Sequence, residues 1–212
     1  MLGGVVIDEH GRTTVPGLYA CGEVAGGLHL KATDQFIGCL VFGKRAGEAA
    51  TREGVDEELP VDEIKREADR ILAVLNNAPK EPIPPYAIRR KLMNTMWEKV
   101  GLAKSESSLN EALNVISEVK ALLPRMYVRD KTKLFNKEWI EALEAYNMVI
   151  VAEMIVKASL MRKESRGVFK RLDYPRSDDK YLGHIYIKKV GDEMVLEFKP
   201  IPKEEVIEKI VL

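Results

Sequence analysis

The sequence predicts an α+β fold, in which short strands and one helix are followed by an α-helical bundle and a C-terminal β-hairpin. Three observations support this fold class. Glycine-bounded apolar runs occupy the first fifty residues, four amphipathic stripes follow, and two segments of alternating apolar and polar residues lie near the end. With 212 residues, the chain is long enough to bury a sizeable core.

The composition is that of an ordinary globular protein. Basic and acidic residues number 33 each, so the formal net charge is zero and nothing attracts nucleic acid electrostatically. The most apolar stretch, residues 148–160, is too short to span a bilayer and contains Glu153 and Lys157. Two cysteines, Cys21 and Cys39, are too few for a disulfide framework and lack iron–sulfur or zinc spacing. Because no signal-peptide pattern is present either, we expect a cytoplasmic location.

Residues 13–27 carry the candidate ligand site. Within them, residues 17–22 form a short apolar run that predicts a buried strand of a parallel sheet, with Cys21 inside it. At Gly22 a ligand can approach the backbone, and the carboxylate of Glu23 can accept hydrogen bonds from ribose or ribityl hydroxyls. This arrangement is typical of a nucleotide site. The plain alternative is that Glu23 caps a loop and the glycines turn it.

Two further elements are predicted beside this stretch. Residues 3–8, entered through two glycines, predict a strand in a hairpin-like pair with the next segment. From about Asp34 to Arg52, apolar residues recur at helical spacing, which predicts a helix. Its amino end would direct backbone N–H groups and a partial positive charge toward a bound ligand.

The segment from His29 to Gln35 joins the predicted strand to this helix. We count His29 and Gln35, together with Gly22 and Glu23, as candidate cofactor-binding residues, although a loop histidine is more commonly just solvated. The cation of the segment is Lys31, a point charge that cannot reproduce the planar fork of an arginine. No catalytic residue and no metal ligand is predicted.

Four amphipathic helices are predicted after the charged loop that follows Glu53. The first two have apolar stripes over residues 61–75 and 88–100, the third is expected to begin with a capping box formed by Ser108 and Glu111, and Asn136 begins the fourth. The fourth is apolar over much of its circumference, so we expect it at the centre of the bundle.

Several large side chains of this region are expected in the core. Burial of Trp97 and Ile150 would make their replacement by alanine costly. Four methionines are interpreted as core filling rather than as cofactor ligands. They are Met93, Met96, Met148 and Met154.

The chain divides into three predicted domains, residues 1–57, 58–165 and 166–212. The last contains two alternating runs with a turn at Gly191 and Asp192, which predict the hairpin. Ahead of it stands the stretch DYPRSDD. This stretch is either a solvated loop tied by weak surface ion pairs or an interaction segment.

Several motifs, in order, resemble one protein family. The segments GGVVID, GRTTVPGLYACGEVAGGLH and LVFGKRAGEAA resemble the second FAD-binding segment of the succinate dehydrogenase, fumarate reductase and L-aspartate oxidase flavoproteins. IRRKLMNTMWEKVGLAKSESSLNEAL and ESRGVFKRLDYPRSDD resemble the C-terminal helical domain of these flavoproteins and its following motif. The family often has alanine and histidine where this chain has Val168 and Phe169. The resemblance extends from Gly3 to about Pro202.

The resemblance implies a flavin-dependent oxidoreductase that transfers hydride between FAD and a dicarboxylate. Complete members begin with a G-x-G-x-x-G fold for the FAD pyrophosphate and carry a proton-donating arginine in a middle domain, and neither occurs in this sequence. We therefore expect the chain to bind FAD only with a flavin-domain polypeptide, and we expect an iron–sulfur subunit to be a further partner. Attachment to the inner face of a membrane would then run through partner subunits. A non-catalytic assembly or protein-interaction module derived from the family is the alternative.

The same reasoning predicts an exposed surface in the first fifty residues. In the family, the sheet that carries Leu18, Tyr19 and Ala20 is covered by elements that this sequence does not encode. Its edge and one face are therefore expected to be bare, and such an edge tends to pair. We expect residues 1–50 to self-associate or to bind a partner.

Overall fold

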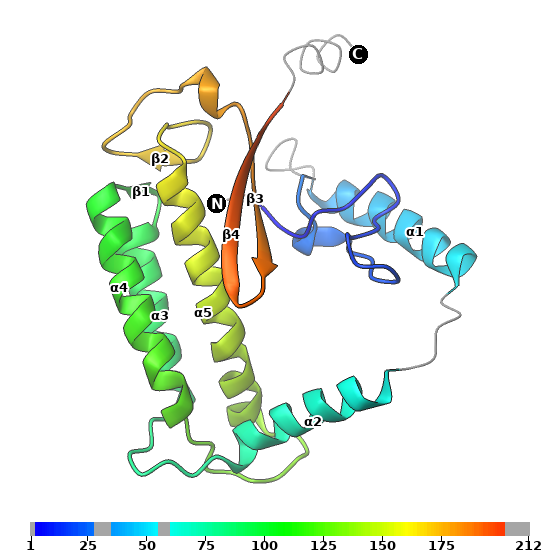
Figure 1. The fold of residues 1–212 in the computed structure, drawn as a ribbon, viewed down its shortest axis with the longest axis vertical. Coiled ribbons are helices and arrows are strands. Elements are labelled where there is room, and N and C mark those ends of the chain that lie inside the picture. Colours follow the sequence, from blue (N-terminus) through cyan, green and yellow to red (C-terminus); the bar gives the residue numbers. More distant parts are fainter. Residues whose placement is uncertain (1–2, 28–34, 55–59, 202–212) are drawn as a thin grey trace. The chain divides into compact units, whose positions relative to one another are not determined.

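The structure, a computed structural model, describes residues 3–27, 35–54 and 60–201 (Figure 1). These residues fall into two compact units, residues 1–61 and 62–212. In the described residues, no helix is both long enough and apolar enough to cross a membrane. Each unit has its own packing and is described by itself.

The first unit consists of loops packed against one helix. Helix α1 (Gln35–Glu53) confirms the predicted helix, and the 3-10 turn η1 (Gly22–Val24) precedes it. A parallel bridge joins Val5 to Ala25, and an antiparallel bridge joins Arg12 to Tyr19. The backbone N–H of Val5 donates to the Val24 carbonyl at 2.8 Å. The loops are thus held by single bridges rather than by a sheet.

The two strands predicted for this unit are therefore wrong as strands. Residues 3–8 and 17–22 each take part in a single isolated bridge, because no other described segment of the unit extends the pairing into a ladder. Cys21, expected inside a buried strand, is exposed. An apolar run becomes a buried parallel strand only where neighbouring strands and helices cover it.

Small residues set the close packing of the first unit. A Cβ atom on Gly4 would lie 2.8 Å from the carbonyl carbon of Ala25, so only glycine lets these two loops touch. Gly11 has φ +77°, and a Cβ there would lie 2.9 Å from the Cβ of Ala46 on α1. The helix consequently rests on the loop through Ala46 and Ala49, which are both buried.

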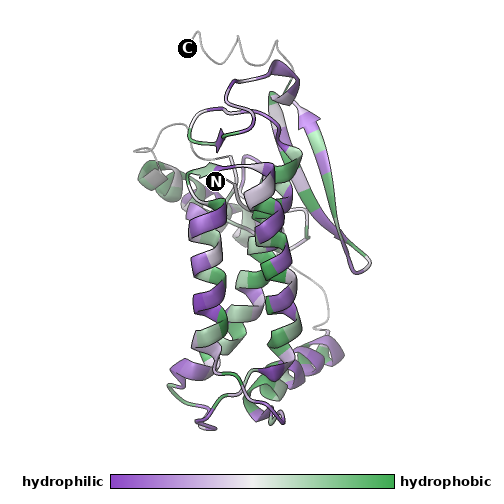
Figure 2. Cartoon of the chain, turned by 90° about the vertical axis from the view of Figure 1, so that its left-hand side faces the viewer, coloured by the Kyte–Doolittle hydropathy of each residue, from purple (hydrophilic) through white to green (hydrophobic). Residues whose placement is uncertain are grey.

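The second unit is built on three helices that lie side by side: α3 (Pro85–Val100), α4 (Glu106–Leu122) and α5 (Lys137–Met161) (Figure 1). Helices α3 and α4 each carry an apolar stripe, whereas α5 is apolar over much of its circumference. Figure 2 colours the residues along these helices by hydropathy. The stripes meet in a single core. Its most deeply buried members include Leu75, Ile88, Leu92, Leu109, Ala112, Ile116, Val119, Met126, Val128, Ala142, Ala145, Val149 and Val156.

Helix α2 (Val61–Asn76) is attached to this bundle at its C-terminal end. Leu75 is buried in the core, and the indole Nε1 of Trp139 donates to the Ile71 carbonyl at 3.1 Å. At the other end of α2, Val61 and Ile64 are more than half exposed. The amphipathic stripe predicted for this helix is therefore covered over its last turns only.

The helix starts show one correct prediction and one error. The Asn136 side chain accepts a hydrogen bond from the Trp139 N–H at 2.9 Å and caps α5 as predicted. The capping box of α4 is formed by Ser105 and Ser108, not by Ser108 and Glu111. Each serine hydroxyl accepts the backbone N–H of the other, at 3.2 and 3.0 Å. Ser108, at the third position of the helix, completes the capping box in place of a glutamate. The helix therefore begins one turn before the predicted start at Ser108.

The C-terminal part of the second unit combines short strands and a hairpin. Strand β1 (Ala103–Lys104) pairs in parallel with β2 (Lys170–Arg171). Strands β3 (Gly183–Val190) and β4 (Glu193–Pro200) form the predicted antiparallel hairpin, with Gly191 at φ +60° in the turn. Short 3-10 turns, η2 (Leu123–Arg125) and η3 (Asp179–Tyr181), follow α4 and precede the hairpin.

The expected burial of several large side chains is wrong. Trp97 is 83% exposed, Met93 is 56% exposed and Ile150 is 47% exposed. Three helices around one core bury one stripe of each helix, so these residues lie on the outer stripes of α3 and α5. Met96 and Met148 are partly buried against the core, in agreement with a packing role.

Candidate functional site

The Gly22–Glu23 turn is the best-defined candidate site in the first unit. Cys21 is extended, Gly22 has φ +76°, and the Ala25 N–H closes the turn by donating to the Gly22 carbonyl at 3.0 Å. A positive φ at this point favours glycine over any residue with a Cβ. An added Cβ on Gly22 would lie 3.6 Å from the Cys39 sulfur, so the turn lies directly beside the first turns of α1.

The Glu23 carboxylate is exposed on this turn. No described side chain or backbone group forms a hydrogen bond or an ion pair with it. The plain alternative, a carboxylate that caps its own loop, finds no support in the hydrogen bonds of the described residues. A free carboxylate at a glycine turn is suited to accept hydrogen bonds from hydroxyl groups of a ligand.

The structure describes the four predicted cofactor-binding residues to different extents. Gly22 and Glu23 lie together on the turn. Gln35 is the first residue of α1, and only its backbone is described. His29 lies outside the described residues. The role of His29 and Gln35 in ligand binding therefore stays a prediction.

A charged cluster that the sequence did not predict fixes the loops of the first unit to α1. The Arg12 Nε donates to the Glu53 Oε1 at 2.6 Å, and its Nη1 donates to the Asp8 Oδ2 at 3.0 Å. The Tyr19 hydroxyl donates to the Glu53 Oε2 at 2.7 Å. The spacing of Asp8 and Arg12 was the one local signal of this cluster, because Glu53 lies far along the sequence.

The charges of this cluster perturb one another. Hydrogen bonds from Arg12 and then Tyr19 hold the pKa of Glu53 below its ordinary value, although burial acts in the opposite direction. The hydrogen bond to Glu53 raises the pKa of the Tyr19 hydroxyl. Since every member has a partner, the cluster holds the two bridged loops in place and offers no free group to a ligand.

A second polar cluster, in the other unit, centres on Arg171. Its side chain is fully buried, and its Nη1 donates to the Ser159 carbonyl at 2.6 Å. The Nε and Nη2 atoms donate to the two carboxylate oxygens of Asp173, at 2.8 and 2.7 Å. This interaction with Arg171 lowers the pKa of Asp173 to about 2, against the opposing effect of burial.

Glu164 is the buried acid of the same region. Its carboxylate is fully buried and accepts hydrogen bonds from Arg162 at 2.6 Å and from Arg166 at 3.1 Å. The Asp178 N–H donates to it at 2.9 Å. The stretch DYPRSDD is anchored at two points, by Asp173 on the buried Arg171 and by the Asp178 N–H on the buried Glu164, while most of its other residues are exposed. Its predicted interaction role stays a prediction. The charged groups around Arg171 and around Glu164 all have hydrogen-bond partners, so their role is to hold the segment that follows α5 in place.

Glu23 is the exposed polar side chain of the Gly22 turn, and it presents one carboxylate. Among the described residues, no group of three or more histidine, cysteine, aspartate or glutamate side chains could hold a metal ion. The described residues can therefore orient a hydroxyl-bearing ligand.

Comparisons with known proteins agree across the chain. The family described as fumarate reductase flavoprotein C-term matches residues 89–210, and the family described as FAD binding domain matches residues 1–32. An uncharacterized FAD-dependent oxidoreductase of Methanocaldococcus jannaschii is 32% identical over 92% of this chain and 35% of its own length. The fumarate reductase (CoM/CoB) of Methanothermobacter marburgensis has one polypeptide that is 35% identical over 83% of this chain and 32% of its own length.

The fold has solved counterparts as well. Mycobacterium smegmatis Sdh1 superimposes with a TM-score of 0.84 at 28% identity, over 93% of this chain and 34% of that chain. The chain therefore spans about a third of the length of the relatives that it matches.

Proposed function

The chain belongs to the fumarate reductase flavoprotein family, of which it forms a C-terminal part, and from this membership we propose that it completes an FAD site together with a flavin-domain polypeptide. The assembled protein would be an oxidoreductase that transfers hydride between FAD and a dicarboxylate. Because the chain spans about a third of its relatives, the remaining parts of the active site would come from the other polypeptide.

The observation that carries this proposal is the exposed Glu23 carboxylate on the Gly22 turn, which makes no hydrogen bond or ion pair with the described residues. It lies within the segment that matches the FAD binding domain, and no described residue occupies it. A ribose or ribityl hydroxyl could donate a hydrogen bond to it, and such a bond to a charged acceptor is strong. Glu23 would thereby orient the cofactor, which supplies the hydride-transfer chemistry when bound.

The first unit also has a surface that suits a partner. On α1, Phe36, Ile37 and Leu40 are at least 60% exposed, although the opposite face of the helix holds the buried Ala46 and Ala49. A helix that is apolar on both faces is typical of a buried element. Leu18 is 53% exposed, whereas Tyr19 and Ala20 are half-buried. A flavin-domain polypeptide would cover these side chains and close the cofactor crevice.

Further partners follow from the same premise. An iron–sulfur subunit would carry electrons to or from the flavin, and attachment to the cytoplasmic face of a membrane would run through such subunits. The dicarboxylate would be bound mainly by the other polypeptide, because the described loops of the first unit present no arginine fork free for a carboxylate.

The proposal is tested by supplying the missing flavin-domain polypeptide in solution. The part of the Methanothermobacter polypeptide that lies outside the region of similarity would be purified and mixed with this chain and FAD. We expect the mixture to retain FAD through gel filtration, whereas the chain alone binds FAD more weakly than about 10 µM, because a minority of the contacts remains. Stoichiometric FAD on the chain alone would contradict the need for a partner. A mixture that assembles without retaining FAD would contradict the cofactor role.

A further inference from the structure

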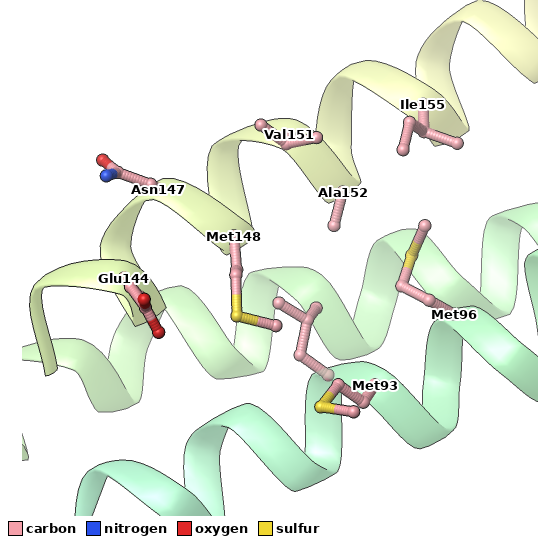
Figure 3. A pocket seen from close by; sticks show the side chains of 9 residues that line it. Met93, Met96, Glu144, Asn147, Met148, Val151, Ala152 and Ile155 are labelled. Atoms are coloured by element: carbon pink, nitrogen blue, oxygen red, sulfur yellow. The ribbon is translucent and has the colours of Figure 1, made fainter. Parts of the chain in front are cut away.

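An apolar groove runs along the outside of the helical bundle, between α3 and α5. Its volume is about 540 Å³. Figure 3 shows Met93 and Met96 of α3 facing Met148, Ala152 and Ile155 of α5. Glu144 and Asn147 are the two polar side chains among those that line it. Methionines line surfaces that adapt to a protein partner, because their side chains are flexible and polarizable.

Met93, which lines the groove, also belongs to a stripe of four side chains on α3. Tyr86, Arg90, Met93 and Trp97 recur at intervals of three and four residues, so they lie on one face of the helix. Tyr86 and Met93 are each 56% exposed, and Trp97 is 83% exposed. Tyrosine, arginine, methionine and tryptophan are the residue types enriched at protein interfaces and at their energetic centres. We call these four residues the α3 stripe.

The charge on the α3 stripe has no counter-charge in the described part of the chain. The adjacent Arg89 pairs with Glu141 and Glu144, each at 3.3 Å. Arg90 is exposed and forms no ion pair with any described residue. Its guanidinium is thus available to stack on an aromatic ring supplied from outside.

We propose that the α3 stripe and the adjoining groove form a two-fold interface with a second copy of this chain. Two α3 helices would lie antiparallel, with the axis between Met93 and Asn94. This axis places Arg90 of each copy opposite Trp97 of the other, since the two residues are equally far from it. Tyr86 then lies opposite Gly101 and Leu102 of the other copy, and Leu102 is 85% exposed.

A second copy of this chain is the favoured partner because the α3 stripe is self-complementary. The α3 stripe contains a cation, Arg90, and an exposed aromatic ring, Trp97, two helical turns apart. In a two-fold interface the same surface of both copies is in contact, so Arg90 of one copy can stack on Trp97 of the other. Met93 of each copy would lie over the apolar groove of the other, near the axis. The inference is independent of the FAD proposal, because all of these residues belong to the helical unit.

The first test measures association of the full chain by analytical ultracentrifugation. We expect a concentration-dependent monomer–dimer equilibrium, and Trp97→Ala should raise the dimer dissociation constant at least about 30-fold, as at an interface hot spot. Arg90→Glu should weaken the dimer as well. The matched control is Leu18→Lys, which alters the exposed apolar surface of the first unit and should leave this dimer intact. A monomer at all concentrations, or association that only the control abolishes, would overturn the proposal.

The second test places a cysteine at the axis. In a Cys21→Ser, Cys39→Ser background, Asn94→Cys should form an intermolecular disulfide under mild oxidation with oxidised glutathione, because the two copies bring this position together. Asn110→Cys, exposed on α4, is the control and should stay reduced. Equal cross-linking at both positions would show random collision and would count against the two-fold arrangement.

Discussion

Arg171 and Asp173 form a bidentate ion pair that connects the segment after α5 to the start of α4. The two bonds measure 2.8 and 2.7 Å, and the Asp173 Oδ2 also accepts the backbone N–H of Glu106 at 2.8 Å. The carboxylate thus neutralises a buried guanidinium and lies at the positive end of a helix. Because of this double role, we expect substitution of Asp173 to destabilise the second unit.

Replacing Asp173 by asparagine is expected to lower the free energy of unfolding by about 3 kcal/mol, because the buried Arg171 would lose its bidentate counter-charge and keep only the Glu106 carboxylate at 3.9 Å. Urea unfolding followed by circular dichroism at 222 nm measures this loss. Asp192→Asn is the control, since its side chain is exposed and its ion pair with Lys189 spans 3.5 Å. It should change stability by less than about 0.5 kcal/mol. Equal effects of the two substitutions would contradict a special role for Asp173.

The same carboxylate predicts acid sensitivity. Its pKa falls from 3.8 to about 2 on folding, so its stabilising contribution is present above pH 4 and is lost as the pH drops toward 2. The lowered pKa of Glu164 acts in the same direction. We expect unfolding free energies measured between pH 5 and pH 2 to fall less steeply for Asp173→Asn than for the wild type.

Flavin retention by the complemented protein tests Glu23. Glu23→Ala is expected to weaken FAD binding by about 1–3 kcal/mol, the cost of losing a hydrogen bond to a charged acceptor. Fluorescence titration of FAD against the assembled mixture provides the measurement. Glu9→Ala removes another exposed carboxylate of the same unit and should leave the affinity unchanged. An unchanged affinity for Glu23→Ala would remove this residue from the site.

The clamp of the first unit predicts a shift in tyrosine ionisation. Glu53→Gln removes the carboxylate that holds the Tyr19 hydroxyl proton, so the pKa of Tyr19 should fall toward its ordinary value. An NMR titration of the ring resonances follows this change, with Tyr86 as the internal reference because it makes no described hydrogen bond. A Tyr19 titration that is the same in both proteins would contradict the hydrogen bond.

Two isoleucines test the location of the core. Ile116 is 1% exposed in the bundle core and Ile150 is 47% exposed on α5. Ile116→Ala should cost about 2–5 kcal/mol through lost burial and a residual cavity. Ile150→Ala should cost about 1 kcal/mol or less, because its site already faces solvent. Thermal or urea unfolding that gives similar losses for both would place the core elsewhere.

The sequence by itself determined the features that depend on local periodicity and local chemistry. The helices of the bundle, the Asn136 cap and the turn at Gly191 were predicted because each is set by residues within a few positions of one another. The order of the motifs also identified the family. Gly22 and Glu23 were predicted in the same way, from a signal within two residues, and their role in ligand binding stays a prediction.

Tertiary structure alone decided everything that depends on neighbours distant in the chain. The two apolar runs of the first unit did not become strands, because their described surroundings provide single bridges and no ladder. Glu53 paired with Arg12, and Asp173 accepted the backbone N–H of Glu106 at the start of α4, through contacts between distant positions that no local pattern encodes. Trp97 remained exposed because a three-helix core reaches one stripe of α3, and an apolar residue is buried only where another surface covers it.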